Sequence, residues 1–395
     1  MARAIEHFDV IILGAGAAGL LCAFTAGRRG RRVLLLDHAD QAGKKILISG
    51  GGRCNFTNLD TKADRFFSNN PHFCKSALAR YTQHDFIALV EKHSIAWHEK
   101  TLGQLFCDGS ARAIVAMLLD ECAAAGVDVR LSHRVSAITK PDRFHIATSH
   151  GEVSAGSLVL ATGGPSIPKM GATGFAYQVA EQFGLKLVQP RPALVPLTFT
   201  GDDLAMMQPL AGVATDVIAT CNRKSFRENL LFTHRGLSGP AILQISSLWQ
   251  PGVPITIDLQ PGEDAGAALL ARKHARPKAE LKTILAETLP QRLAHALVQT
   301  GYPARPIGEI PDKGLHRLAA RLKHWSLTPS GTEGYGKAEV TIGGIDTSGL
   351  SSRTLEANDI PGLYAIGEAV DVTGWLGGYN FQWAWSSGFC AGMAV

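Results

Sequence analysis

Hydrophobic residues near the start of the chain fall into two short runs, Val10–Leu13 and Val33–Leu36, separated by a glycine-rich turn and the longer apolar stretch Ala17–Gly27. Short apolar runs are typical of buried strands, and the stretch between them is long enough for a helix. A similar succession returns near the other end, where Leu363–Ile366 is followed by a Gly-Gly pair and a segment rich in small residues. The pattern predicts an α/β protein.

Further elements are predicted between these two ends. Apolar residues at helical spacing in Phe86–Ile95 and Ser110–Gly126 predict two helices, the second with Ser110 as its N-cap. Val127–Ser149 divides into three strands, the last two around a Pro-Asp turn, and predicts a β-meander. The apolar run Leu158–Gly164 predicts a buried strand that ends in Ala-Thr-Gly-Gly, next to a bound cofactor.

The middle of the chain departs from this pattern. Proline-rich Gln189–Gly201 interrupts it, and alternating apolar residues in Val213–Cys221 and Pro254–Leu259 predict antiparallel strands. From about residue 265 to 325 the chain is helical and basic. We therefore expect a discontinuous α/β domain, residues 1–190 and 336–395, and an inserted domain, residues 191–335, that is β-rich over 191–260 and helical over about 261–325.

Composition and charge narrow the class of protein. A hydrophobic content of 46% and a charged content of 18% are typical of a well-buried chain and give no case for disorder. The net charge of +5 is mildly basic; it suits an anionic cofactor or substrate but is too diffuse to indicate nucleic acid. Seven scattered cysteines without a CxxC pair indicate a reducing compartment, which we take to be the cytoplasm, with no disulfide framework and no metal site.

One uncharged stretch of eighteen residues, Val10–Gly27, has the hydropathy of a membrane anchor. Acidic Glu6 and Asp9 precede it in place of basic residues, and its glycines occupy strand-to-helix positions. We therefore expect no membrane span.

The same stretch carries the first functional motif. Gly14-x-Gly16-x-x-Gly19 lies between a strand and a helix, and Asp37 ends the next strand. This is the dinucleotide spacing: Gly14 makes the tight turn, Gly16 lets a pyrophosphate approach, and Gly19 lets helix and strand pack closely. The first helical amides, near Ala18, then face the phosphates, and Asp37 accepts a ribose hydroxyl.

The C-terminal block identifies the dinucleotide as FAD. A short strand is followed there by Gly-Glu-x-x-Asp and by a glycine pair that opens a helix. A second dinucleotide-like unit at the far end of the chain suits a flavin, because Asp371 can bind the ribityl chain or the pyrophosphate. The amides of Gly378 to Phe381 can stabilise negative charge on the flavin.

A third candidate motif is the run of three consecutive glycines in "SGGGRCNFTN", residues 49–58. We hypothesise that Gly50–Gly52 let the backbone lie against the flavin ring, while Arg53 and Asn55 bind cofactor phosphate, flavin or an anionic substrate. Cys54 is a candidate reactive thiol, but the next cysteine, Cys74, is twenty positions away and cannot resolve it as in disulfide reductases. A structural thiol is favoured.

Together these segments, with Phe232–Pro240 and Val340–Ile345, resemble the YhiN/BaiN-like flavoproteins over nearly the whole chain. The resemblance implies an NAD(P)/FAD-dependent or aminoacetone-oxidase-like oxidoreductase, with a glutathione-reductase-like FAD-binding Rossmann domain and an insertion that is part β-barrel and part helical. Asp37 stands where that family usually has glutamate, and Cys107 where it has proline. The expected cofactor-binding residues are Gly14, Gly16, Ala18, Gly19, Asp37, Gly51, Gly52, Arg53, Asn55, Val135, Thr162, Gly163, Glu368, Asp371, Gly378, Asn380 and Phe381.

Several functions remain open at this stage. The first is an oxidoreductase that transfers hydride between non-covalently bound FAD and a small-molecule substrate, with NAD(P)H as a candidate co-substrate although no second GxGxxG unit is present. The others are an aminoacetone-like amine oxidase that uses oxygen, an RNA-binding or RNA-modifying flavoprotein, and a flavin-bound redox sensor. His234 and Arg235 are candidate substrate contacts. Because the basic helical run is more typical of a solvated surface, we do not expect nucleic acid as a partner.

Overall fold

The computed structural model describes residues 5–299 and 304–395. The chain divides into two compact units, one formed by residues 1–191 and 340–395 and the other by residues 192–339. None of the described helices is long and apolar enough to cross a membrane.

A seven-stranded sheet organises the first unit, in the order β7-β2-β1-β10-β9-β8, with β20 also paired to β10. Strands β1, β2, β7, β10 and β20 are mutually parallel, whereas β8, β9 and the first half of β10 are antiparallel. This is the predicted mixed α/β architecture. The bounds are β1 Glu6–Leu13, β2 Val33–Leu36, β7 Asp128–Arg130, β8 Val135–Thr139, β9 Phe144–Thr148, β10 Gly151–Leu160 and β20 Leu363–Ala365.

One detail of this sheet differs from the prediction. The first strand of Val127–Ser149 is β7, which pairs in parallel with β2 and takes no part in a meander. The meander is instead β8-β9-β10, because β10 begins at Gly151, seven residues before the predicted buried strand. Alternating polar residues in the first half of β10 conceal it from a search for apolar runs.

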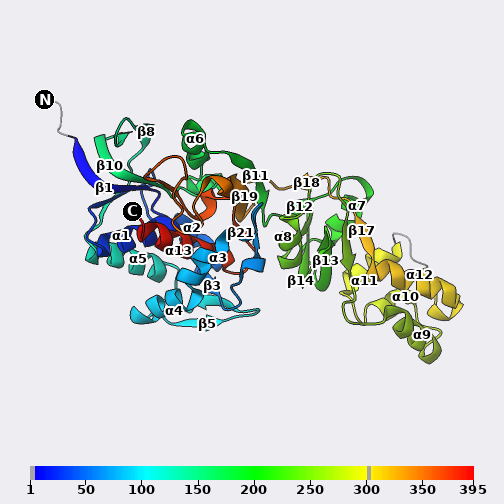
Figure 1. Ribbon diagram of the computed structural model, residues 1–395. Helices are drawn as coiled ribbons and strands as arrows, with labels where there is room; N and C mark the ends of the chain where they lie inside the picture. The colour runs from blue at the N-terminus through cyan, green and yellow to red at the C-terminus, as the bar shows by residue number, and fades with distance from the viewer. Residues whose placement is uncertain (1–4, 300–303) are drawn as a thin grey trace. The chain divides into compact units, whose positions relative to one another are not determined.

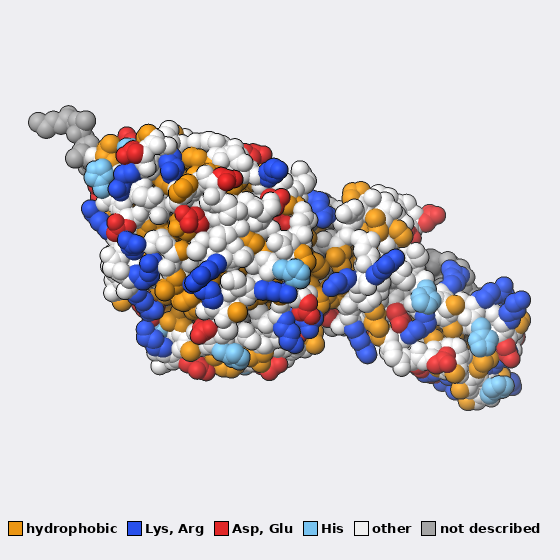
Figure 2. All heavy atoms as spheres, in the orientation of Figure 1, with side chains coloured by type: hydrophobic (Ala, Val, Ile, Leu, Met, Phe, Trp, Pro, Cys, Tyr) orange, Lys and Arg blue, Asp and Glu red, His pale blue; other side chains and the backbone are white. Residues whose placement is uncertain are grey.

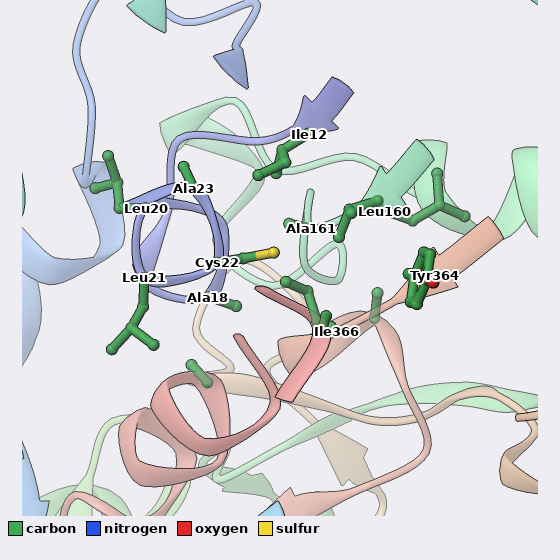
Figure 3. Packing of buried hydrophobic residues seen from close by; sticks show 14 of the residues in the cluster. Ile12, Ala18, Leu20, Leu21, Cys22, Ala23, Leu160, Ala161, Tyr364 and Ile366 are labelled. Atoms are coloured by element: carbon green, nitrogen blue, oxygen red, sulfur yellow. The ribbon is translucent and has the colours of Figure 1, made fainter. Parts of the chain in front are cut away.

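Helices α1 (Ala17–Arg28) and α13 (Tyr379–Gly392) lie side by side against this sheet (Figure 1). Two glycines permit the contact, since a Cβ on Gly388 would lie 2.5 Å from the carbonyl oxygen of Ala18, and one on Gly392 would lie 2.7 Å from that of Cys22. Figure 3 shows Ala18 and Cys22 of α1 facing Ala161 and Ile366 in the core beneath the two helices. The small residues of the C-terminal segment therefore serve close helix packing.

The two predicted helices of the first unit form with shifted bounds. Helix α4 is Gln83–Lys92 and begins three residues early, because Thr82 and Asp85 form a capping box. Helix α5 is Arg112–Ala124, and its N-cap is Ala111 rather than Ser110. The remaining elements of this unit are α2 Lys44–Ile48, β3 Asn55–Asn58, β4 Phe66–Phe67, α3 Cys74–Arg80, β5 Trp97–Glu99, β6 Gln104–Cys107, α6 Phe175–Gln182, β19 Val340–Ile345 and β21 Thr373–Gly374.

The second unit is built on an antiparallel seven-stranded sheet in the order β17-β16-β13-β14-β15-β12-β18. The two predicted strands are β13 and β16, which pair with each other. Strand β11 (Leu187–Ala193) leads into this unit and contains two prolines. The bounds are β12 Leu197–Thr198, α7 Gly201–Met207, β13 Ala214–Cys221, β14 Lys224–Thr233, β15 Gly236–Ser238, α8 Pro240–Ser246, β16 Ile255–Asp258, α9 Ala265–Ala275, α10 Leu281–Leu285, α11 Gln291–Gln299, α12 Asp312–Lys323, β17 Trp325–Leu327 and β18 Gly331–Thr332.

Candidate functional site

The glycine turn between β1 and α1 has one open position. Gly14 has a φ of 110°, and a Cβ there would lie 2.5 Å from the carbonyl oxygen of Ala161. A Cβ on Gly19 would lie 1.9 Å from the carbonyl oxygen of Gly14, whereas one on Gly16 would have no atom within 4 Å. Gly14 and Gly19 are thus required by the fold, and Gly16 leaves room for a ligand at the start of α1.

Asp37 holds this turn in place. Its Oδ2 accepts a hydrogen bond from the amide of Ala15 at 2.7 Å, and its Oδ1 accepts one from the amide of Ala39 at 2.8 Å. The amide of His133 donates to the Asp37 carbonyl at 2.8 Å, which brings the start of β8, and hence half-buried Val135, close to the end of β2. Each carboxylate oxygen retains a lone pair for a further donor such as a ribose hydroxyl.

Thr162 supplies an independent sign of a missing ligand. It lies two residues after the end of β10, and its hydroxyl oxygen is buried without a hydrogen-bond partner among the described residues. Buried hydroxyls in folded proteins are nearly always satisfied. At Gly163, which has a φ of 69°, a Cβ would meet only an oxygen of Glu368, at 3.5 Å. A buried hydroxyl without a partner, next to a glycine with free space around it, is consistent with a binding site for a dinucleotide.

Glu368 forms an ion pair that the sequence did not indicate. Its Oε2 lies 2.8 Å from the Nζ of Lys45, and its Oε1 accepts hydrogen bonds from the hydroxyl of Ser166 and the amide of Thr341, both at 2.9 Å. Lys45 also donates to Ser166 at 2.7 Å. Burial opposes ionisation of Glu368, but Lys45 and these donors outweigh it and lower the pKa of the carboxyl. This cluster fixes the turn that follows β20.

The glycine triplet forms a single 3-10 turn, Ser49–Gly52, in which Gly50, Gly51 and Gly52 all have positive φ. A Cβ on Gly50 would lie 2.8 Å from the ring of Phe106, but Gly51 is exposed and a Cβ there would meet nothing within 4 Å. Arg53 is also exposed, and its side chain has no hydrogen-bond or ionic partner within residues 5–299 and 304–395. Part of the triplet therefore serves the fold and part presents open backbone and a free cation.

Cys54 is unsuited to thiolate chemistry in this arrangement. The residue is fully buried, and burial raises the pKa of its thiol well above the ordinary value. Cys107, at the end of β6, donates its amide to the carbonyl of Arg53 at 3.0 Å, a hydrogen bond that the proline usual in the resembled family cannot make. Both observations favour a structural Cys54.

Strand β3, which follows the triplet, packs directly on the C-terminal glycine pair. A Cβ on Gly378 would lie 2.4 Å from the carbonyl oxygen of Thr57, and Asn58 donates to the carbonyl of Gly377 at 2.9 Å. With its side-chain oxygen turned toward Gly378, Asn55 accepts a hydrogen bond from the backbone amide of Gly378 at 3.2 Å. The two glycine blocks, more than 300 residues apart in sequence, thus form one structure.

The remaining predicted ligands are already engaged in holding the site. The side-chain amide of Asn380 exchanges hydrogen bonds with the backbone of Gly374 at 2.8 and 2.9 Å, and the ring of Phe381 stacks on that of Trp385. Asp371 is 2% exposed and accepts the amide of Asn69 at 2.8 Å; burial raises the pKa of its carboxyl. These side chains support the loop, so any contact from residues 378–381 to a cofactor is made by backbone.

His234 and Arg235 lie in the second unit, exposed in the tight turn between β14 and β15. The carbonyl of Arg235 accepts the amide of Phe199 at 3.0 Å, and the carbonyl of His234 accepts the side-chain amide of Gln208 at 3.4 Å. Their backbones are fixed, and neither side chain forms a hydrogen bond or ion pair with the described residues.

Lys45 is a residue of the candidate site that the sequence failed to single out. It occurs in Gly43-Lys44-Lys45, and adjacent lysines before a polar glycine-rich segment are typical of an exposed turn. Its partner is 323 positions away. Its position five residues before the glycine triplet was the only signal, and it is a weak one.

Comparison with known proteins places the chain in a family. A family model described as HI0933-like protein Rossmann domain matches residues 8–394. A ribosomal RNA dihydrouridine synthase of Escherichia coli K12 is 54% identical over 98% of each chain, and a 3-dehydro-bile acid delta(4,6)-reductase of Clostridium scindens is 29% identical over 97% of this chain and 98% of its own.

Among solved structures, a 3-ketosteroid-delta4-(5alpha)-dehydrogenase of Rhodococcus jostii RHA1 has a TM-score of 0.50 at 16% identity, covering 98% of this chain and 97% of that one. At this identity the likeness is one of fold. It agrees with a Rossmann-type flavoprotein architecture.

One expectation is corrected by these findings. We did not expect nucleic acid as a partner, but the relative at 54% identity is named for a reaction on ribosomal RNA, which points to an RNA substrate and makes that expectation wrong. A net charge of +5 over the whole chain concealed the signal. The match over residues 8–394 shows that the chain belongs to the HI0933-like Rossmann family, confirms its resemblance to the YhiN/BaiN-like flavoproteins, and makes it an FAD-dependent oxidoreductase.

Proposed function

We propose that this protein is an FAD-dependent ribosomal RNA dihydrouridine synthase, which adds two hydrogens across the C5–C6 double bond of a uridine. The main support for this proposal is the 54% identity, over 98% of both chains, to the E. coli protein of that name. The bile acid reductase of Clostridium scindens is likewise named for a reduction, which favours a reductase over the amine oxidase considered above.

The residues of the first unit suit FAD. Open backbone at Gly16 and the unpaired amides at the start of α1 would hold the pyrophosphate, and Asp37 the ribose hydroxyls. Bound FAD would also give the buried hydroxyl of Thr162 a hydrogen-bond partner. Reduced FAD supplies a hydride to an electron-poor carbon, and a proton completes the product.

The glycine triplet provides the substrate side of this proposal. Hydride addition at C6 of uracil moves negative charge toward the C4 carbonyl oxygen. Arg53, exposed and without an ionic partner in the described chain, carries a fixed positive charge next to the open backbone of Gly51. We assign Arg53 to stabilising that charge. The buried thiol of Cys54 is given no role as a proton donor.

NAD(P)H is proposed as the reductant. Two electrons and two protons enter dihydrouridine, so each turnover consumes one hydride from a nicotinamide and one proton from solvent. The reaction leaves uridine reduced and the nicotinamide oxidised. We also place the protein in the cytoplasm, where its RNA substrate is made and where its seven cysteines, all free and buried, stay reduced.

The test is anaerobic incubation of the FAD-loaded protein with ribosomal RNA and either NADH or NADPH. Dihydrouridine is then measured by mass spectrometry of the digested RNA, and we expect it to accumulate with one donor. Two alternative substrates are tested in separate incubations: a steroid enone without oxygen, and an aliphatic amine with oxygen. Turnover of either one without dihydrouridine in the RNA would overturn the proposal.

A further inference from the structure

The positive charge of the protein is concentrated in one segment. Residues 265–325 contain eleven Lys or Arg against four Asp or Glu, a net charge of +7, whereas the rest of the chain has 28 against 30, a net charge of −2. This segment forms helices α9 to α12 of the second unit. Figure 2 shows Lys, Arg and His side chains gathered over these helices.

Half of the acidic groups in this segment are already neutralised. Asp312 lies 2.7 Å from the Nζ of Lys273, and Glu287 pairs with Arg272 at 2.8 Å and with Arg276 at 2.5 Å. Only the exposed carboxyls of Glu280 and Glu309 carry no ion pair in the described segment. Five exposed cations have no hydrogen-bond or ionic partner within residues 5–299 and 304–395, and we call them the basic surface: Lys278, Lys282, Arg305, Lys313 and Arg317.

The backbone brings these five residues together. The segments 277–281 and 305–308 run beside each other, since the amide of Leu281 donates to the carbonyl of Arg305 at 3.2 Å and that of Gly308 to Pro277 at 2.9 Å. Lys273 donates to the carbonyl of Ile310 at 2.7 Å, which ties the end of α9 to the start of α12. The basic surface therefore covers one connected part of the helical layer.

Helix α12 places two cations of the basic surface along one side. Lys313 and Arg317 are one turn apart, about 6 Å along the axis, while Leu315, Leu318 and Leu322 are buried on the opposite face. The leucines account for the packing of the helix and leave the cations without a structural partner. Long exposed cations spread over a helical layer suit an extended polyanion better than a small anion, which needs converging donors.

We propose that the basic surface docks the phosphate backbone of the RNA substrate. The inference rests on the proposed function for its choice of RNA over other polyanions. Such contacts position a nucleic acid without reading its sequence, so the surface would contribute affinity, and the flavin site would select the uridine. A solvated surface that only keeps the protein soluble is the alternative that the experiment decides.

The test compares two double variants that lose the same charge. Lys313→Gln/Arg317→Gln removes two cations of the basic surface, and Lys75→Gln/Lys186→Gln removes two exposed cations of the first unit. Binding of a fluorescent ribosomal RNA fragment is followed by anisotropy between 50 and 200 mM salt. We expect the first variant to bind at least tenfold more weakly, with a salt slope shallower by about 1.4, at about 0.7 per lost phosphate contact, and the control to match the wild type.

A second readout separates this inference from the proposed reaction. Reduction of the bound flavin by NAD(P)H should be unchanged in both variants, which also shows that they are folded, while the KM for RNA rises only in the first. If the wild type forms dihydrouridine and Lys313→Gln/Arg317→Gln binds RNA as tightly as the wild type, the docking role of the basic surface is wrong and the proposed reaction is not affected. If that variant binds RNA more weakly but the wild type forms no dihydrouridine, the docking role is supported and the proposed reaction is wrong. Equal weakening in both variants, or no RNA binding by the wild type, would also overturn the surface.

Discussion

At the scale of single residues, Gly16 and Gly19 separate cofactor binding from folding. A methyl group on Gly16 meets no protein atom within 4 Å, so Gly16→Ala should leave the stability of the cofactor-free protein unchanged and weaken FAD binding at least tenfold, about 1.4 kcal/mol. Gly19→Ala places a methyl 1.9 Å from a backbone oxygen and should cost about 2–3 kcal/mol of stability. Flavin fluorescence titration and thermal unfolding measure the two effects.

A suitable control for this pair is Gly109→Ala, because Gly109 also has open space around it but lies outside the predicted site. It should change neither property. Full FAD affinity in Gly16→Ala would contradict the placement of the pyrophosphate. Gly14, Gly16 and Gly19 could be predicted because their spacing defines a local turn, whereas the pairing of Lys45 with Glu368 depends on how distant segments fold together.

The ion pair between Lys45 and Glu368 predicts a pH-dependent stability change. With Lys45 present, the pKa of Glu368 is lowered, so the carboxylate contributes stability above about pH 4.5 that is lost as the pH falls through its folded value. In Lys45→Met only the donors Ser166 and Thr341 still oppose the effect of burial, so the pKa of Glu368 rises and the variant loses stability as the pH increases. Relative to the wild type it should be destabilised by about 2 kcal/mol at pH 7.5 and by much less at pH 4.5.

Urea unfolding at the two pH values measures this difference. The adjacent Lys44→Met is the matched control, because Lys44 pairs with Asp40, whose side chain is 81% exposed. We expect no measurable change there at either pH. A pH-independent loss in Lys45→Met would mean that the lysine acts through packing and not through the charge of Glu368.

At the scale of elements, the beginnings of α4 and α5 differ in a testable way. Thr82 caps α4, accepting the amide of Asp85 at 3.4 Å while its own amide donates to the Asp85 carboxylate at 2.7 Å. Ser110 lies before the N-cap of α5 and accepts only the amide of Arg112, at 3.3 Å. Thr82→Ala should therefore destabilise its helix by about 1 kcal/mol, and Ser110→Ala by clearly less.

Hydrogen exchange of the first-turn amides of each helix is the appropriate measurement. Equal acceleration in both variants would show that the serine caps α5 after all. The case illustrates what a single sequence could predict: apolar spacing located both helices, but the choice among several polar residues at each start depends on backbone angles. The same holds for the strand after Gly126, whose pairing with β2 rather than with a meander is a tertiary choice.

At the scale of the whole molecule, the sequence indicated the α/β fold class, the flavin and the oxidoreductase family, because glycine spacing and short strands recur at both ends of the chain. It did not indicate the RNA substrate. Summed over 395 residues the charge is only +5, yet residues 265–325 alone carry +7. The rest of the same unit, residues 192–264 and 326–339, has 5 Lys or Arg against 9 Asp or Glu, a net charge of −4, which hides the basic segment. Charge is therefore better counted for each predicted segment.

The division into two units predicts how FAD affects unfolding. Every residue proposed to bind the cofactor lies within 1–191 or 340–395, so FAD should stabilise that unit and not the unit of residues 192–339. At a hundredfold excess over its Kd, FAD should add about 2.7 kcal/mol to the stability of the first unit. Hydrogen exchange with mass spectrometry, with and without FAD, should show slower exchange in β1, β10 and α13 and unchanged exchange in β13 and β14. Gly16→Ala should abolish the difference, and protection spread equally over both units would refute a cofactor site built from the first unit alone.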